Sequence, residues 1–552
     1  SRAQPRTSRR TRLEVPVQGM MMNFNLSIAA VMRQALMVAA DTEIVSLFAD
    51  GRVHRYTYAS AFARARRLAD GLDALGCPDD ARVGTLAWND HRHFELHYAI
   101  PCSGRICHTI NPKLSPEQIS YIIRHAEDDV LFVDLQFIPL LESIQPELDR
   151  VRWYVALCPW DEIPDSTLPN LLSYEKLIAD ADENYNWPEL DENRASGLCY
   201  TSGTTGNPKG VLASHRSTVL HGMAQNMADN VGLRALDVVM PMVPMFHVNA
   251  WGMPYNAAMV GAKLVLPGPR VGDAAAMVRL INQEHVSFSL AVPTLWSNIS
   301  TYLDAQGEHI PTLKRAVSGG AACPLSLIHA MGRHGVALEN GWGMTELSPM
   351  GSYNRHQPWY DVLPEEPRSQ QVLKSGQALF GVEMRIVDEA GNALSHDGQS
   401  SGSLQVRGPW VCSGYFGQPA SHVWFDTGDV ATIDRRGYLL ITDRIKDVIK
   451  SGGEWISSVE IENAITAHPL IAEAAVIGVP HARWSERPLL IVVPKHPEKV
   501  PRHDELIAFL EGRIPKWWLP DASEYLNELP HTATGKVSKK TLREQFDHYV
   551  WP

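Results

Sequence analysis

Residues 200–210 read Tyr-Thr-Ser-Gly-Thr-Thr-Gly-Asn-Pro-Lys-Gly, and this stretch decides how the rest of the chain is read. It holds three glycines, four Ser/Thr hydroxyls and one lysine. Glycines allow tight turns and close approach to a ligand. Successive N–H groups and hydroxyls can then cradle phosphate oxygens, and the lysine adds a point charge. The stretch is not a Walker A loop, because no Gly-Lys-Ser/Thr ends it. It predicts a phosphate-binding loop, and a polar surface loop is the alternative.

The sequence on both sides of this loop alternates between short apolar runs and amphipathic helical patterns. Such alternation predicts parallel sheets with helices on both faces, which is an α/β, doubly wound architecture. The loop follows the apolar run 198–200, so it lies at a strand end, where ligands of open α/β sheets generally bind. The expected helices are 26–37, 60–75, 93–99 and 116–126, and the expected strands are 45–47, 55–58, 83–86, 106–110, 130–133, 237–243, 263–266, 286–292 and 315–318.

The pattern changes beyond about residue 380. Short strands with turn signals at 382–387, 403–407 and 438–441 predict a small β-rich subdomain. A polar break at 443–447 precedes a compact unit with expected helices at 458–468 and 504–513. We therefore expect three segments: residues 1–21 as a disordered leader, 22–442 as the large N-terminal domain, and 443–552 as a small α+β C-terminal domain that is mobile.

Composition excludes several broad classes. A chain of 552 residues is too long for one compact core. Its net charge of −12 argues against a nucleic-acid partner. No apolar run approaches the roughly 18 residues that span a bilayer. Seven scattered cysteines without CxxC spacing indicate reduced thiols, so we expect a cytoplasmic protein. The arginine-rich start, residues 1–19, is also compatible with a transit peptide.

Five further stretches carry chemical groups. Residues 244–252 place a histidine and two aromatics among apolar residues, and residues 319–321 are small enough for backbone approach to a flat ligand. Residues 340–346 combine glycines with a hydroxyl and a carboxylate that suit a hard cation. Residues 427–429 end in a carboxylate suited to ribose hydroxyls, and residues 532–536 end in a lysine after a glycine. Each alone is also explained by an ordinary turn or core segment.

In this order, the stretches resemble the adenylate-forming superfamily, which includes acyl-CoA synthetases, firefly luciferase and peptide-synthetase adenylation domains. The resemblance covers roughly residues 22–546. Within the superfamily the chain is most similar to bacterial fatty-acid–CoA ligases. Residues 243–268, 443–458 and 518–521 carry that similarity.

The resemblance implies an ATP-dependent, AMP-forming acid–thiol ligase. A carboxylate is a poor electrophile because its leaving group would be oxide. Its attack on the α-phosphate of ATP makes an acyl-adenylate and pyrophosphate, and the thiol of CoA then expels AMP. Catalysis of the first step is mostly positioning and electrostatic stabilisation. The expected partners are a carboxylic acid, ATP, Mg²⁺ and coenzyme A, and we also expect a homodimer.

The resemblance also assigns residues. The expected catalytic residues are Lys536, Lys209, Glu346 and Thr201, with Thr201 and Glu346 as Mg²⁺ ligands and His247, Trp251 and Gly320 beside the acyl substrate. The expected contacts of ATP, the adenylate and the pantetheine path are Thr201, Ser202, Gly203, Thr204, Thr205, Gly206, Lys209, Gly320, Ala321, Asn340, Gly341, Trp342, Thr345, Asp429, Arg444, Lys446, Lys450, Trp455 and Lys536. The C-terminal domain would adopt two orientations. One brings Lys536 to the adenylate, and the other presents residues 452–453 to the thiol.

Alternatives remain at this point. An amino-acid adenylation domain usually has an aspartate after the aromatic of the histidine segment, whereas here His247 follows Phe246. Lys450 is shared with luciferases and does not discriminate. If the chain were a non-catalytic nucleotide-binding protein, we would expect Lys536, Glu346 or Lys209 to be replaced. All three residues are present. Medium-chain, long-chain, aryl-propenoic and methylthio acids all stay open as substrates. The link 417–424 is shorter than in many relatives, which puts the local loop structure in doubt.

Overall fold

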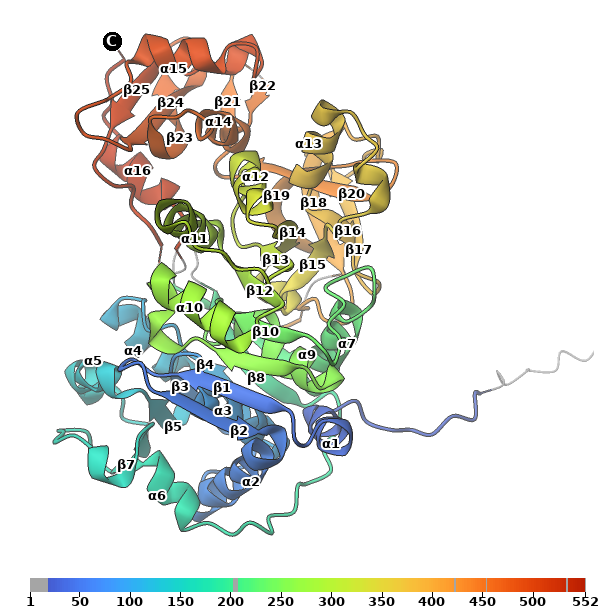
Figure 1. Cartoon of the computed structure of the whole chain (residues 1–552), viewed down its shortest axis with the longest axis vertical. Helices are drawn as coiled ribbons and strands as arrows, with labels where there is room; N and C mark the ends of the chain where they lie inside the picture. Colours follow the sequence, from blue (N-terminus) through green and yellow to red (C-terminus); the bar gives the residue numbers. More distant parts are fainter. Residues whose placement is uncertain (1–17, 202–206, 421–422, 453, 533–534, 552) are drawn as a thin grey trace, which may run out of the picture.

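The computed structural model of the chain describes residues 18–201, 207–420, 423–452, 454–532 and 535–551. Figure 1 shows two stacked layers of sheet and helix in the N-terminal part, with the C-terminal unit at the opposite end from the first sheet. The α/β class predicted from the alternating pattern is confirmed. Of the predicted site residues, Ser202, Gly203, Thr204, Thr205 and Gly206 lie outside the described residues.

The first sheet holds the strand that leads into the phosphate loop. Its strand order is β7-β6-β5-β3-β4-β8-β9, and all neighbours are parallel except the β8–β9 pair. Side chains of β5 alternate, with Val130 and Phe132 in one core and Leu131 and Val133 in another, as the period of two requires. The strands are β3 (Arg82–Leu86), β4 (Ile106–Thr109), β5 (Asp128–Val133), β6 (Trp153–Ala156), β7 (Leu171–Ser173), β8 (Ala195–Thr201) and β9 (Lys209–Ser214).

Helices cover both faces of this sheet. The core on one face includes residues of α2, α3 and α6, and the core on the other face includes residues of α4 and α5. The helix α4 begins at a capping box in which Ser115 and Gln118 satisfy each other's free backbone N–H groups. The helices are α2 (Tyr58–Ala74), α3 (His91–Cys102), α4 (Pro116–Ala126), α5 (Ile138–Ile144), α6 (Tyr174–Ala179) and α7 (His215–Gln225).

The second sheet has the order β17-β18-β19-β20-β16-β15-β14-β13-β12-β10-β11-β1-β2. Its centre is parallel, and its β-rich end is antiparallel. The predicted β-rich subdomain therefore continues the hydrogen bonding of the large sheet through the β14–β15 pair. The strands are β1 (Glu43–Leu47), β2 (Val53–Thr57), β10 (Val238–Pro241), β11 (Lys263–Leu266), β12 (Phe288–Ala291), β13 (Arg315–Ser318), β14 (Ala337–Gly343), β15 (Met350–Tyr353), β16 (Gly376–Ala378), β17 (Glu383–Val387), β18 (Ser401–Arg407), β19 (Phe425–Ile433) and β20 (Tyr438–Arg444).

Helices α10, α11 and α12 pack against the parallel centre of this sheet, and their buried residues join residues of β10–β13 in a core of mainly aliphatic side chains with Trp296. The buried residues of α1 and α9 belong to the core that also covers one face of the first sheet. The helices are α1 (Ile28–Val38), α9 (Met253–Val260), α10 (Ala274–Glu284), α11 (Pro293–Gln306), α12 (Leu325–Arg333) and α13 (Glu365–Leu373).

The C-terminal unit has its own sheet and its own cores. Its strand order is β22-β21-β24-β23, with β25 parallel to β24. The cores on the two faces contain only residues beyond 448. The elements are β21 (Ile449–Ser451), β22 (Glu454–Ile456), β23 (Ile471–His481), β24 (Ser485–Pro494), β25 (Ala522–Tyr525), α14 (Ser458–Ile465), α15 (His503–Leu510) and α16 (Lys539–Gln545). Along the described part of the chain, no helix combines the length and apolarity that crossing a bilayer requires.

Candidate active site

The phosphate loop is the connection of an antiparallel hairpin. Thr201 ends β8 and Lys209 begins β9, and the two residues are register partners. The described ends of the loop therefore place the Thr201 hydroxyl and the exposed Lys209 side chain next to each other at one edge of the first sheet. Strand β8 also contacts η5 (Thr345–Leu347), which carries the predicted metal carboxylate.

Glu346 is the buried carboxylate of this site, and only 6% of its surface is exposed. Its Oε1 accepts a hydrogen bond of 2.9 Å from the Tyr415 hydroxyl. Burial raises the pKa of Glu346, and the Tyr415 hydrogen bond and the positive charges of Arg444 and Lys209 oppose that rise. Cations nearby therefore favour the ionised carboxylate, the form that a metal ion needs.

The residues present fit Mg²⁺. This ion keeps several waters and is usually held by one or two carboxylates together with substrate phosphates. Thr201 and Glu346 offer a hydroxyl and a carboxylate, both oxygen ligands, on elements that contact each other. No cluster of three or more His, Cys, Asp and Glu side chains that could hold a metal occurs within the described ranges. A metal here would therefore take its other ligands from phosphate oxygens and water.

Asp429 lies in the middle of β19 and is almost completely buried. Its Oδ1 forms an ion pair of 2.7 Å with Nε of Arg444, and its Oδ2 accepts a 2.9 Å hydrogen bond from Nε1 of Trp342. Burial raises the pKa of Asp429, and the Arg444 charge is the main opposing effect. Arg444, which the sequence placed at a hinge, is thus also a direct neighbour of the predicted ribose carboxylate.

The predicted wall of the adenylate site is formed by the ends of two neighbouring parallel strands, β13 and β14. Gly320 has a φ of +81°, a conformation that glycine adopts without strain. Asn340 is buried and donates its side-chain N–H to the carbonyl of Val372 at 2.9 Å. Ala321 is exposed, whereas Gly341 and Thr345 are half-buried.

Lys536 reaches this wall from the C-terminal unit. A Cβ placed on Gly320 would lie 3.9 Å from Cε of Lys536. Loss of hydration and the nearby Arg444 charge lower the pKa of Lys536 to about 8, although the carboxylates of Asp429 and Glu346 favour its charged form. The structure therefore brings the predicted catalytic lysine together with Gly320, Asp429, Arg444 and Glu346.

The other predicted residues of the C-terminal unit are arranged differently. Lys450 and Trp455 are register partners in the β21–β22 hairpin, and Nζ of Lys450 lies 5.5 Å from the centre of the Trp455 ring. Neither side chain forms a hydrogen bond or ion pair with Asp429 or Glu346 among the described residues. Burial and the Arg444 charge lower the pKa of Lys446, although the Asp447 carboxylate favours its charged form. Gly453 lies outside the described residues.

The histidine segment has a conformation that the sequence did not predict. From Val248 to Trp251, which form α8, every residue has a φ between +46° and +56°. This is a left-handed turn made entirely of non-glycine residues, which is unusual because each such residue costs about 1–2 kcal/mol. No glycine marks these four positions, so no sequence signal could have found the turn.

This left-handed turn presses Trp251 against the predicted adenylate wall. A Cβ placed on Gly319 would lie 2.8 Å from the Trp251 ring, and one placed on Gly320 would lie 3.9 Å from it. The Trp251 side chain is buried. His247 precedes the turn, and burial together with the Lys536 charge lowers its pKa to about 4. His247 is therefore neutral at neutral pH.

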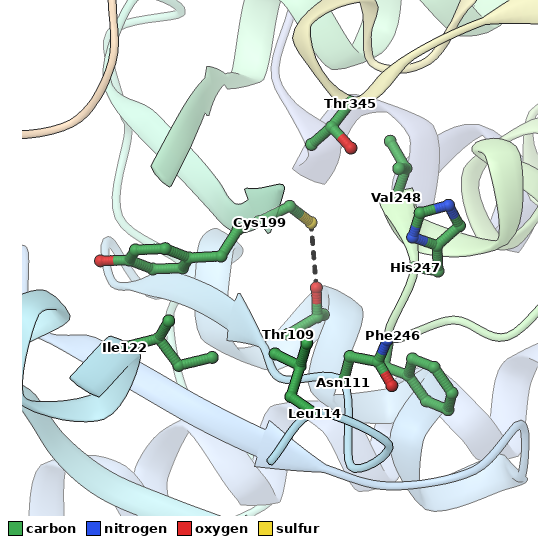
Figure 2. A pocket seen from close by; sticks show the side chains of 10 residues that line it. Thr109, Asn111, Leu114, Ile122, Cys199, Phe246, His247, Val248 and Thr345 are labelled. Atoms are coloured by element: carbon green, nitrogen blue, oxygen red, sulfur yellow. Dashed lines mark hydrogen bonds between the residues drawn. The ribbon is translucent and has the colours of Figure 1, made fainter. Parts of the chain in front are cut away.

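A small enclosed cavity lies behind His247 (Figure 2). Its volume is about 10 Å³, which is room for about one water molecule. Figure 2 shows Ile122 on one side and His247 on the other, with a 3.0 Å hydrogen bond between Thr109 Oγ1 and Cys199 Sγ between them. The sequence analysis did not single out three residues that line this cavity, Thr109, Asn111 and Cys199. They lie on or directly after the neighbouring parallel strands β4 and β8. Because parallel strands end at the same edge of a sheet, their positions could have been found from the predicted strands.

The link 417–424, which we expect to be shorter than in many relatives, follows a segment that backbone hydrogen bonds hold at both ends. Cys412 N–H donates to the carbonyl of Glu346, and Phe416 N–H donates to the carbonyl of Gly210, each at 2.8 Å. Residues 421–422 of the link lie outside the described residues. The unusual local structure expected for the link therefore stays a prediction. The preceding residues 412–416 are fixed at both ends by these two backbone hydrogen bonds.

Comparisons with known proteins agree with this geometry. A protein named medium-chain-fatty-acid–CoA ligase from Ectopseudomonas oleovorans is 46% identical over 96% of this chain and 97% of its own length. A protein named 3-methylmercaptopropionyl-CoA ligase from Ruegeria pomeroyi is 49% identical over 96% of this chain and 98% of its own length. The crystal structure of the anthranilate CoA ligase AuaEII in complex with anthranoyl-AMP has the same fold, with a TM-score of 0.84 and 24% identity over 95% of this chain and 97% of that chain.

Two family profiles match along the chain. The AMP-binding enzyme profile matches residues 33–416, and the profile of the AMP-binding enzyme C-terminal domain matches residues 460–536. The first match alone covers more than half of the chain. The chain therefore belongs to the AMP-binding enzyme family.

Proposed function

We propose that the chain is an AMP-forming acyl-CoA ligase that activates a small or medium-sized aliphatic carboxylic acid. The observation that carries this proposal is the position of Lys536 beside Gly320, where the charges of Asp429 and Glu346 act on its ammonium group. A single ammonium group at this point lies between the predicted acyl carboxylate and the predicted nucleotide wall. It can neutralise both anions as they approach each other.

The roles of the chain's own residues follow from their charges and positions. Lys536 orients the substrate carboxylate toward the α-phosphate, and Lys209 attracts the departing pyrophosphate. Asp429 accepts from the ribose hydroxyls, and Trp342 and Arg444 hold its carboxylate in place. His247 borders the acyl group as a neutral ring and is not a general base, because its pKa lies far below neutral.

Thr201 and Glu346 would hold Mg²⁺ when it is present. The ion then supplies charge neutralisation for the phosphate oxygens. Glu346 keeps its carboxylate fixed through Tyr415. The family match supports the use of ATP and CoA, and the oxygen-ligand set supports the choice of Mg²⁺.

Domain motion is the second part of the proposal. We assign residues 22–442 to the body, 443–552 to the mobile unit and 1–21 to a leader. The separate sheet and cores of the C-terminal unit, which begin at Ile449, support a division near this point. With Lys536 in the site, the chain is in the orientation for adenylation. In this orientation Asp443 and Arg444 still pair with β19 as the end of β20. A second orientation would withdraw Lys536 and bring the Lys450–Trp455 hairpin to the thiol of CoA.

The substrate proposed first is a short thioether acid, 3-(methylthio)propanoate. Relatives with this activity in their names are 48% and 49% identical over 96% of the chain. The Trp251 ring, packed against Gly319, supports a short acyl space. A medium-chain fatty acid is the second candidate, supported by the relative that is 46% identical.

We also propose a homodimer and a cytoplasmic location. Met20, Met21, Met22 and Phe24 are highly exposed on an extended segment that leaves the body of the molecule (Figure 1). A second copy of the chain would cover them. A light-scattering mass near 61.3 kDa, the mass of one chain, would contradict the dimer. The seven cysteines are all free, which supports a reducing compartment.

The test is pyrophosphate release with a panel of acids, measured with and without CoA. The panel contains 3-(methylthio)propanoate, straight-chain acids of increasing length, an aryl-propenoic acid and amino acids. Acyl-CoA and AMP should form in equal amounts, with the highest kcat/KM for the thioether acid. Release of pyrophosphate with amino acids alone would contradict the acyl-CoA ligase assignment, and no release with any acid would contradict an enzyme of this class.

A further inference from the structure

Residues 412–416 connect the two predicted phosphate-binding elements. Through the backbone, Cys412 binds the carbonyl of Glu346 and Phe416 binds the carbonyl of Gly210, in β9. Glu346 lies on the 3₁₀ turn η5 and Gly210 lies next to Lys209. The segment therefore sets the distance between the carboxylate turn and the phosphate hairpin.

Tyr415 is the one side chain of this segment that contacts both charged groups. Its hydroxyl donates to Oε1 of Glu346 at 2.9 Å. The ammonium of Lys209 lies 4.9 Å from the centre of its ring, within the range of a cation–π interaction. The half-buried Tyr415 side chain thus binds the Glu346 carboxylate through its hydroxyl and the Lys209 ammonium group through the face of its ring.

The hydrogen bond from the Tyr415 hydroxyl to Oε1 fixes the orientation of the Glu346 carboxylate. The ring of Phe425 contacts the Tyr415 ring and limits its rotation.

We propose that Tyr415 is a positioning residue, which holds Glu346 and Lys209 at the separation that a Mg²⁺–triphosphate group requires. This inference rests on the proposed function, because the roles of Glu346 and Lys209 come from it. Tyr415 would not touch the substrate itself. It would act through the two residues that do.

The test measures ATP binding by isothermal titration calorimetry over a series of Mg²⁺ concentrations. In Tyr415→Phe, the Mg²⁺ concentration for half-maximal ATP binding should rise about tenfold, since hydrogen bonds to charged groups are among the stronger ones. In Tyr415→Leu, the KM for ATP should be about threefold higher than in Tyr415→Phe, because Lys209 also loses its contact with the aromatic ring. The KM for the carboxylic acid should not change in either variant.

Tyr302 offers a matched control. Its hydroxyl also donates to a glutamate, Glu308, at 2.9 Å, on the exposed end of α11. Tyr302→Phe should leave the Mg²⁺ dependence as in the wild type. If Tyr415→Phe also leaves it unchanged, the positioning role is wrong. It is also wrong if the KM values for ATP and acid rise together while the melting temperature falls, because that pattern indicates a general structural role.

Binding and turnover separate this inference from the proposed function. If ATP binds in a Mg²⁺-dependent way that Tyr415→Phe shifts, yet no acid yields acyl-CoA, the positioning role holds and the proposed function fails. If acyl-CoA forms and Tyr415→Phe does not shift the Mg²⁺ dependence, the inference alone fails. If the wild type does not bind ATP, both are wrong.

Discussion

Arg444 and Asp429 face each other across two antiparallel strands, and Nε of Arg444 lies 2.7 Å from Oδ1 of Asp429. Trp342 donates to the second oxygen of the same carboxylate. Both carboxylate oxygens are thus held from the protein side. A ribose would meet a carboxylate that is already fixed in orientation, which lowers the cost of binding.

Asp429→Asn should raise the KM for ATP about tenfold or more, because hydrogen bonds to a charged group contribute about 1.5–3 kcal/mol. The substitution keeps the size of the side chain. Competition by inorganic tripolyphosphate, which has no ribose, provides the comparison. Its inhibition constant should stay the same. Equal weakening of ATP and tripolyphosphate would show that Asp429 acts on the phosphates or on the fold.

The rate of adenylation should fall as the pH rises above about 8. Burial lowers the pKa of Lys536 to about 8, so its cationic form is present below that pH and is lost above it. The value of kcat/KM for ATP reports on the free enzyme and should show this basic limb. Transfer from supplied acyl-adenylate to CoA should instead rise with pH, since the thiol ionises. A shared basic limb in both half-reactions would contradict the assignment to Lys536.

Trp251→Leu should shift the preference toward longer acids. The Trp251 ring packs against Gly319 and Gly320, and a smaller side chain frees space beside the predicted acyl position. The ratio of kcat/KM for a medium-chain acid to that for 3-(methylthio)propanoate measures the shift. Trp153, which is half-buried in the first sheet, provides the control, and Trp153→Leu should not alter the ratio. Unchanged selectivity in Trp251→Leu would make Trp251 a core residue only.

Ala250→Gly should leave the melting temperature unchanged or raise it. Ala250 has a φ of +48°, where glycine is free of the left-handed penalty of about 1–2 kcal/mol. Ala65 is equally buried but lies in the right-handed helix α2. Ala65→Gly should lower stability by about 1 kcal/mol. A similar loss in both variants, measured by scanning fluorimetry, would contradict the left-handed turn.

The residues show which parts of the structure were predictable from sequence. Helices α2 and α4 follow from apolar periodicity and turn residues, so the predicted ranges 60–75 and 116–126 lie close to the observed ones. The strand before the phosphate loop, β8, was predicted only over 198–200, and helix α7 after the loop was not predicted. The contacts of Tyr415 with Glu346 and of Arg444 with Asp429 depend on strand register and loop packing between distant segments. No local pattern encodes those contacts. The left-handed turn at 248–251 is imposed by tertiary packing against the propensities of its residues.

We propose that Lys536 serves the first half-reaction and not the second. Its side chain lies next to Gly320, and the charge of the Asp429 carboxylate acts on its ammonium group. If the domain swings away before thiol attack, the second half-reaction proceeds without this ammonium group. The two half-reactions can be measured separately on one variant.

The most direct measurement is made on Lys536→Ala. Pyrophosphate release from ATP and acid is assayed in parallel with acyl-CoA formation from supplied acyl-adenylate. Pyrophosphate release should fall by about 10²–10³-fold or more, the scale of losing one electrostatic stabiliser, while acyl-CoA formation should stay within a few-fold of the wild type. An equal loss in both half-reactions, or unchanged pyrophosphate release, would contradict this role of Lys536.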